Sequence, residues 1–125
     1  MFALDERDVQ PGCREIRVRG ELDLAVAPEL ERAIERADEY GQVVISLEEC
    51  DFLDSTGIAA IVGAYHARES GNRRLAVCAP EGQVRRVLDL TGVSNNGLVF
   101  ENAADALAAA GDRVETQFPD DPTEN

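Results

Sequence analysis

Residues 51–58, with the sequence DFLDSTGI, carry the side chains best suited to chemistry in this chain. Ser55 and Thr56 each offer a hydroxyl, and Asp54 places a carboxylate beside them. A serine hydroxyl becomes a catalytic nucleophile only when a base lies within hydrogen-bonding reach. The one histidine, His66, follows eleven residues later, which is about 16 Å along a helix at a rise of 1.5 Å per residue. We therefore predict no catalytic residue and no enzyme, and a serine hydrolase is the least favoured alternative.

A better chemical role for Ser55 is that of a substrate. An exposed hydroxyl can accept a phosphoryl group from a kinase that supplies the nucleotide, the metal and the base. A phosphate is tolerated where a helix begins, because the backbone N–H groups and the helix dipole favour anions there. It would add about −1.5 to −2 charges next to Asp51 and Asp54 and repel a protein packed against them. The segment predicts a phosphorylation switch at Ser55, with Thr56 as the second choice of acceptor.

The same residues also have purely structural interpretations. Ser55 is well placed to be an ordinary N-cap of a helix, and Asp54 to stiffen the turn through an Asx-type hydrogen bond. Asp23 is suited to capping the helix predicted to start near Val26, as well as to a role in binding a partner. Gly57 in a first helical turn costs about 1 kcal/mol relative to alanine. It therefore indicates the close approach of another backbone or of a partner.

Metal and cofactor chemistry has less support, and we predict neither. The three cysteines, Cys13, Cys50 and Cys78, lie far apart without a Cys-x-x-Cys pair. This pattern favours buried, reduced thiols in a cytoplasmic protein over a zinc site or a disulfide framework. A site made of four carboxylates is conceivable, but no spacing rule supports it. Those carboxylates are Glu21, Asp23, Asp51 and Asp54.

Composition excludes several further classes. The 125 residues include 25 acidic and 12 basic side chains, for a net charge of −13, and every basic residue other than His66 is an arginine. An acidic chain is a poor ligand for phosphate backbones, so nucleic-acid binding is not expected. The absence of lysine argues against a P-loop. Neither a membrane-spanning run nor a secretory leader is predicted.

The hydrophobic pattern predicts an α/β fold. Helical stripes begin near residues 26, 58, 84 and 103, and strand-like runs lie at 2–4, 15–19, 43–47, 75–79 and 98–100. The order β-β-α-β-α-β-α-β-α indicates a mixed, mostly parallel sheet of four to five strands with an N-terminal antiparallel hairpin, packed with about four helices. We expect the first helix to end at Gly41, and functional loops to follow Gly20 and Leu47.

Residues 1–111 are predicted to form one domain. The apolar pattern stops after Gly111, and two prolines in the segment PDDP at 119–122 oppose a continued helix or ladder. We expect residues 112–125 to be an acidic, disordered tail. No exposed apolar seam predicts a stable homo-oligomer, so a monomer is the default expectation.

Taken together, these motifs resemble the STAS domain of bacterial anti-sigma factor antagonists. The resemblance covers about residues 2–111 and rests most strongly on the Asp-Ser-Thr-Gly segment, Asp54 to Gly57. The other matching segments are Gly20-Glu21-Leu22-Asp23, Pro28 with Leu30, Gly71-Asn72, and Val87 to Val93.

The resemblance implies a regulator that acts by partner switching and a STAS fold. In that family the unphosphorylated protein binds an anti-sigma factor, which is also a serine kinase with a histidine-kinase-like ATPase fold, and the sigma factor is released. Phosphorylation of the serine corresponding to Ser55 breaks the complex, and a serine phosphatase restores it. The residues that would line the partner-binding surface are Asp23, Asp54, Ser55, Thr56 and Gly57.

The same fold also serves other classes of protein. One alternative is an accessory subunit of an ABC-type lipid transport complex, in which the related segment contacts an ATPase without being phosphorylated. Another is a component of a stress-signalling scaffold that assembles into large particles.

Overall fold

The computed structural model describes residues 1–108, apart from the side chains of Asn95 and Asn96. Five strands form one sheet whose order follows the sequence. β1 and β2 pair antiparallel and all the other neighbours pair parallel, so the predicted mixed sheet with its N-terminal hairpin is confirmed. The strands are β1 (Ala3–Gln10), β2 (Cys13–Leu22), β3 (Gln42–Leu53), β4 (Arg74–Cys78) and β5 (Val99–Phe100).

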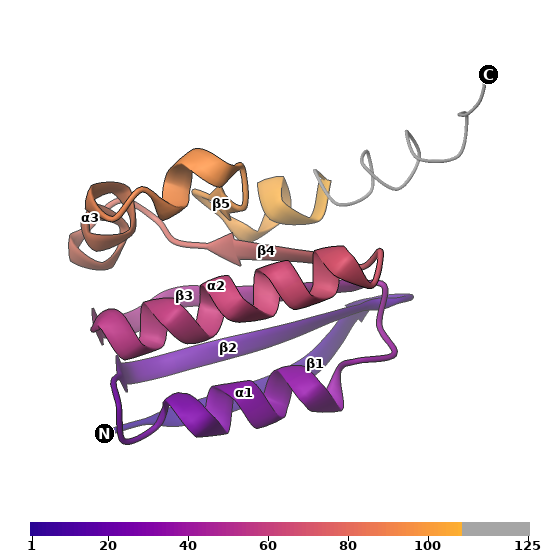
Figure 1. Ribbon diagram of the computed structural model, residues 1–125, viewed down its shortest axis with the longest axis horizontal. Coiled ribbons are helices and arrows are strands. Elements are labelled where there is room, and N and C mark those ends of the chain that lie inside the picture. The colour runs from indigo at the N-terminus through magenta and orange to yellow at the C-terminus, as the bar shows by residue number, and fades with distance from the viewer. Residues whose placement is uncertain (109–125) are drawn as a thin grey trace.

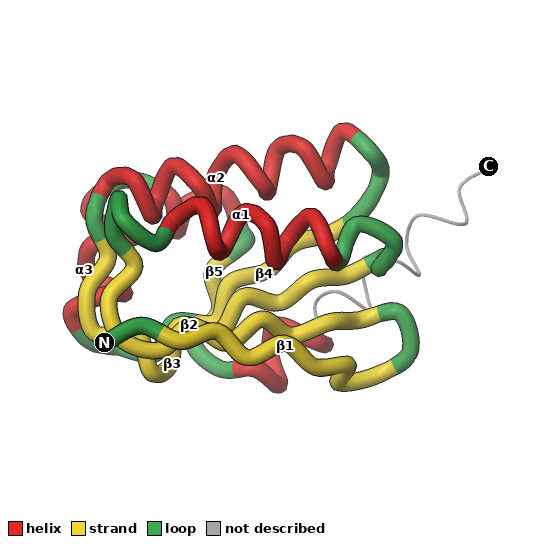
Figure 2. Tube along the Cα trace, turned by 90° about the horizontal axis from the view of Figure 1, so that it is seen from below, coloured by secondary structure: helices red, strands yellow, loops and turns green. Residues whose placement is uncertain are grey.

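Helices connect the parallel strands, as parallel pairing requires. They are α1 (Ala27–Arg36), α2 (Ser55–Ser70) and α3 (Gln83–Leu90), followed by the 3₁₀ turn η1 (Val93–Asn96). α1 and α2 lie side by side on one face of the sheet (Figures 1 and 2). The predicted last helix is present over residues 103–108, and Asn102 caps it by accepting a hydrogen bond from the Asp105 amide at 2.8 Å. The acidic tail predicted at 112–125 lies outside the described residues.

Apolar side chains cover both faces of the sheet. The larger cluster joins β2, β3 and β4 to α1, α2 and α3, and includes Ile16, Ile45 and Ile61, none of which is exposed. On the other face, Val44 packs with the residues around Ala106. Successive residues of β3 therefore point into different clusters, which is the pattern of an interior strand covered on both sides.

All three cysteines are free and buried, as predicted. Burial raises the pKa of the Cys13 thiol to about 11 and that of the Cys78 thiol to about 12. Both thiols therefore stay protonated near neutral pH and behave as small apolar side chains.

The end of α1 differs from the prediction. The helix finishes at Arg36 with Ala37 as its C-cap, and Gly41 does not adopt a left-handed conformation. The residues after the helix are held instead by Arg68 of α2. Its guanidinium donates hydrogen bonds to the carbonyl oxygens of Ala37, at 3.3 Å, and of Tyr40.

β2 and β3 run beyond their predicted ends. Loops were expected after Gly20 and Leu47, and both positions are wrong because β2 continues to Leu22 and β3 to Leu53. The strands stay paired up to those residues, with two shifts of register along the way. The functional loops consequently begin after Leu22 and Leu53.

Ion pairs explain why the polar part of β3 remains a strand. The Glu49 carboxylate lies 3.1 Å from the Arg17 guanidinium and 2.9 Å from that of Arg19, both on the neighbouring β2. Arg7 and Glu15 make a similar pair, at 3.0 Å, between β1 and β2. The hydropathy of residues 48–51 is typical of a loop, but cross-strand charge pairing keeps them in the sheet.

Candidate functional site

Two segments distant in the sequence meet where β2 and β3 end. The parallel register places Glu21 beside Phe52 and Leu22 beside Leu53. The Asp54 amide then donates a hydrogen bond to the Leu22 carbonyl oxygen at 3.3 Å. The segment between β2 and α1 and the start of α2 therefore form one surface at the carboxyl edge of the sheet, where open α/β sheets place their ligands. We call this surface the β2/β3 edge.

Asp54 fastens the two segments together. One carboxylate oxygen, Oδ1, accepts a hydrogen bond from the Gly57 amide at 3.0 Å, which makes Asp54 the N-cap of α2. The other oxygen, Oδ2, accepts from the Leu24 amide at 3.3 Å. The interpretation of Ser55 as the N-cap is therefore wrong. Aspartate caps a helix as well as serine does, and here its second oxygen also reaches the neighbouring loop.

Ser55 is left as the first residue of α2, and its side chain is available. The residue is exposed, and its hydroxyl makes no hydrogen bond to any of the described residues. Thr56 is only partly exposed. Of the two hydroxyls in the motif, that of Ser55 is the more accessible from solvent. It lies where the helix dipole favours negative charge.

Gly57 is buried and serves contacts within the chain. A Cβ atom at this position would lie 2.9 Å from the Leu22 carbonyl oxygen and 2.8 Å from Leu53 Cδ1. The close backbone approach predicted for Gly57 is therefore the approach of α2 to the end of β2. Within the β2/β3 edge, this glycine lets α2 begin directly against the sheet.

Asp23 shapes the loop between β2 and α1. Its carboxylate accepts a hydrogen bond from the Ala25 amide at 3.1 Å, and its carbonyl oxygen accepts from Val26 at 3.1 Å and from Ala27 at 2.9 Å. The N-cap position of α1 belongs to Val26, which makes no side-chain capping bond. Asp23 therefore forms an Asx turn three residues before the cap, and its interpretation as the helix cap is wrong.

Exposed apolar and acidic side chains lie on the two segments that form the β2/β3 edge. Leu24 is 71% exposed and Phe52 is 46% exposed. Glu21 and Asp51 are exposed and form no ion pair with any described residue. The sequence reasoning missed Leu24, which lies between two motif positions. The sequence carries no local signal for it, because the exposure of this leucine follows from the fold.

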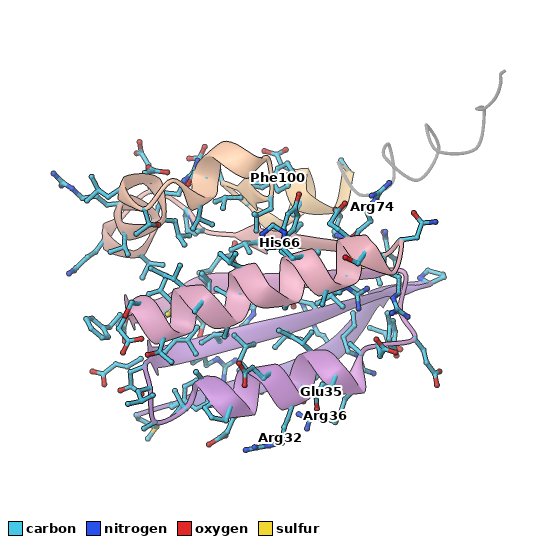
Figure 3. All side chains as sticks on the ribbon, in the orientation of Figure 1. Arg32, Glu35, Arg36, His66, Arg74 and Phe100 are labelled. Atoms are coloured by element: carbon cyan, nitrogen blue, oxygen red, sulfur yellow. The ribbon has the colours of Figure 1, made fainter. Side chains whose placement is uncertain are left out.

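His66 does not support the hydrolase alternative. It is exposed on α2 and contacts the ring of Tyr65, with the ring centroids 5.4 Å apart. Figure 3 shows it well along the helix from the residues that begin α2. Both Ser55 and His66 lie on this one continuous helix, so its rise separates them by about 16 Å.

Neither a metal centre nor a membrane span is evident in residues 1–108. Within this part of the chain, no three histidine, cysteine or acidic side chains converge as cation ligands would. The helices in the same region are also too short or too polar to cross a bilayer.

Comparison with known proteins places the chain in a family. Residues 6–106 match the family model of the STAS domain, and the chain belongs to that family. An anti-sigma F factor antagonist of Paenibacillus polymyxa is 31% identical over 96 residues, which cover 74% of this chain and 81% of that protein. An anti-sigma-B factor antagonist of Staphylococcus aureus (strain NCTC 8325 / PS 47) is 29% identical over 92 residues, covering 72% of this chain and 85% of the relative.

Solved structures agree with the fold. The crystal structure of an anti-sigma factor antagonist from Mycobacterium paratuberculosis superimposes with a TM-score of 0.81 at 29% identity, covering 89% of this chain and 95% of that one. The relatives named here are thus anti-sigma factor antagonists, in agreement with the resemblance found in the sequence.

Proposed function

We propose that this chain is a cytoplasmic anti-sigma factor antagonist switched by phosphorylation of Ser55. Its unmodified form binds an anti-sigma factor that is also a serine kinase of the histidine-kinase-like ATPase fold, and the sigma factor is released. Phosphorylation of Ser55 ends the complex, and a serine phosphatase restores the binding form. The chain itself has no catalytic role in this cycle.

The observation that carries the proposal is the state of the Ser55 hydroxyl. It is exposed, it makes no hydrogen bond among the described residues, and it stands on a surface that Asp54 holds together from two loops. A phosphoacceptor has to enter the active site of a kinase, so a hydroxyl engaged in capping would be a poor substrate. The names of the relatives support the same class of regulator.

The chemical step is a phosphoryl transfer. Ser55 Oγ attacks the γ-phosphorus of ATP bound to the kinase, the bond to the bridging oxygen of ADP breaks, and the hydroxyl proton passes to a base of the kinase. The product carries about −1.5 to −2 charges near neutral pH. A partner that packs closely against the bare serine has no room for the phosphate and would have to remove water from its charge, so the complex is lost. Asp54 keeps its capping bonds, so the fold is expected to persist.

The test is phosphosite mapping by mass spectrometry. The chain is incubated with ATP and each candidate anti-sigma kinase from its own genome, next to Ser55→Ala and Thr56→Ala variants. We expect phosphate on Ser55 in the wild type and in Thr56→Ala, and none in Ser55→Ala. Phosphate on Thr56 alone, or no phosphate with any of the kinases, would contradict the proposal.

The same preparations separate the alternatives. An accessory subunit of a transport complex would co-purify with an ATPase in both the wild type and Ser55→Ala, without phosphate transfer. A scaffold component would elute as a large assembly in size-exclusion chromatography. A hydrolase would turn over an activated ester and lose that activity in Ser55→Ala.

A further inference from the structure

Leu24 is exposed in a way that requires an explanation. Within residues 1–108 the exposed large apolar side chains are Met1, Leu24, Phe52 and Leu90. Two of these four belong to the β2/β3 edge. Leu24 lies in the loop after β2, and Phe52 lies near the end of β3. Covering a leucine side chain stabilises a complex by an amount that scales with the apolar area removed from water. An exposed leucine beside a proposed binding site is therefore a candidate contact.

The loop that carries Leu24 is held in place by hydrogen bonds. The Leu24 amide donates to Asp54 Oδ2 at 3.3 Å, and the Ala25 amide donates to Asp23 Oδ1 at 3.1 Å. Two further amides, those of Val26 and Ala27, donate to the carbonyl oxygen of Asp23. The backbone on both sides of Leu24 is thus fixed, and the exposed side chain is presented from an ordered loop. Presenting an anchor in this way lowers the entropy that binding has to overcome.

The two chain segments that build the β2/β3 edge have charged side chains of one sign. Residues 20–31 and 48–65 contain no lysine, arginine or histidine. Among their acidic residues, Glu21 and Asp51 are exposed and form no ion pair with any described residue. The surface thus has an apolar centre and an acidic rim. The complementary surface has an apolar pocket bordered by arginine or lysine side chains.

We propose that Leu24 is an apolar anchor of the partner-binding surface, inserted into an apolar pocket with a basic rim on the anti-sigma factor kinase. This inference rests on the proposed function, because the occupant is the kinase that acts on Ser55. Asp54 is the positioning residue, since the same carboxylate that caps α2 also holds the Leu24 backbone. The Asp54 side chain therefore positions both residues that the kinase would contact, Ser55 and Leu24.

Two properties of the complex follow. Leu24 supplies affinity through the area it buries, so its loss acts mainly on the dissociation rate. The acidic rim supplies attraction over a longer distance, so added salt slows association. These two readouts separate the apolar part of the contact from its charged part.

The experiment measures association and dissociation rates with the kinase that phosphorylates Ser55, at several salt concentrations. Leu24→Asn removes the apolar side chain at similar size, and Leu24→Met is the matched control that keeps it. We expect Leu24→Asn to raise Kd about tenfold and Leu24→Met to change it less than about threefold, since Leu and Met are near-isosteric. Thermal unfolding of both variants is expected to match the wild type because the side chain is mostly in solvent.

The outcomes distinguish this inference from the function on which it rests. If no kinase binds the wild-type chain, the proposed function fails and the inference fails with it. If the wild type binds and Leu24→Asn binds equally tightly, the anchor is wrong while the function stands. If the association rate of the wild type did not change with salt, the proposal that basic residues border the pocket would be wrong.

Discussion

The two ends of the parallel strands are finished in different ways. At the amino end, Arg68 is 4% exposed and donates hydrogen bonds to three backbone carbonyl oxygens, two in the connection after α1 and one in β4. Burial, with a further contribution from the nearby Arg73, lowers the pKa of its guanidinium. At the carboxyl end, Asp54 joins two loops, but Ser55 and Leu24 are left exposed.

The difference shows how the chain divides stability from binding. At the amino end, the guanidinium of Arg68 and the carbonyl oxygens that it binds find their partners inside the molecule, which adds to the free energy of unfolding. The exposed groups at the carboxyl end have no such partners within residues 1–108, so another protein can use them without breaking the fold. Substitutions at the first end are expected to change stability, and exposed ones at the second to change binding.

The largest expected effect is the loss of Arg68. Arg68→Met keeps much of the side-chain volume but removes the donors to Arg74, Ala37 and Tyr40. Because three hydrogen bonds from a buried guanidinium are lost, we expect a loss of about 3 kcal/mol in the free energy of unfolding. Urea denaturation measures it. Arg32→Met, at an exposed position of α1, is the control and is expected to change stability by less than about 0.5 kcal/mol. If the two variants lost the same amount of stability, the hydrogen bonds of Arg68 would not make the amino end a stabilising region.

Glycines on α2 provide the next test. Gly57→Ala would force a Cβ against the Leu22 carbonyl oxygen, which as backbone cannot easily move, and we expect a loss of about 2 kcal/mol. Gly63→Ala is the matched control, since nothing lies within 4 Å of its Cβ position. We expect that variant to gain up to about 1 kcal/mol from helix propensity. If both substitutions were stabilising, α2 would not begin as close to β2 as described.

The smallest effect concerns Asp8 at the amino end. Hydrogen bonds from Tyr40 and then Arg14 hold the pKa of the Asp8 carboxyl below its ordinary value. A carboxyl whose pKa is lower in the folded state contributes stability above its unfolded pKa, about 3.9, and loses it as the pH falls through the folded value.

Asp8→Asn should therefore be slightly less stable than the wild type at neutral pH, and the difference should shrink as the pH falls below about 4. Thermal unfolding recorded across the acid range measures this trend. The effect is expected to be small because the pair is exposed to solvent. A difference that grew on acidification would contradict the assignment.

Much of the fold was predictable because its signals are local. Periodicity predicts α2 and the buried parts of the strands. The strand ends were missed because Glu48 and Glu49 have the composition of a loop, and only pairing with arginines on β2 keeps them extended. Pairing between segments distant in the sequence cannot be predicted from the hydropathy of either segment alone.

The site was predictable in part for the same reason. The motif predicts that Ser55 and Asp54 belong to the site, but it does not show which of them caps α2. That choice depends on the Leu24 amide, which reaches Asp54 from another loop. Leu24 itself was missed because an exposed leucine is identified only when burial is known.

The most direct test compares the chain in two states against the same partner. Purified protein with bare Ser55 and protein fully phosphorylated on Ser55 are titrated into the anti-sigma kinase by calorimetry, after thermal unfolding has verified that both are folded. We expect the bare form to bind at least about tenfold more tightly, equivalent to 1.4 kcal/mol. Equal affinity of the two folded forms would contradict the account.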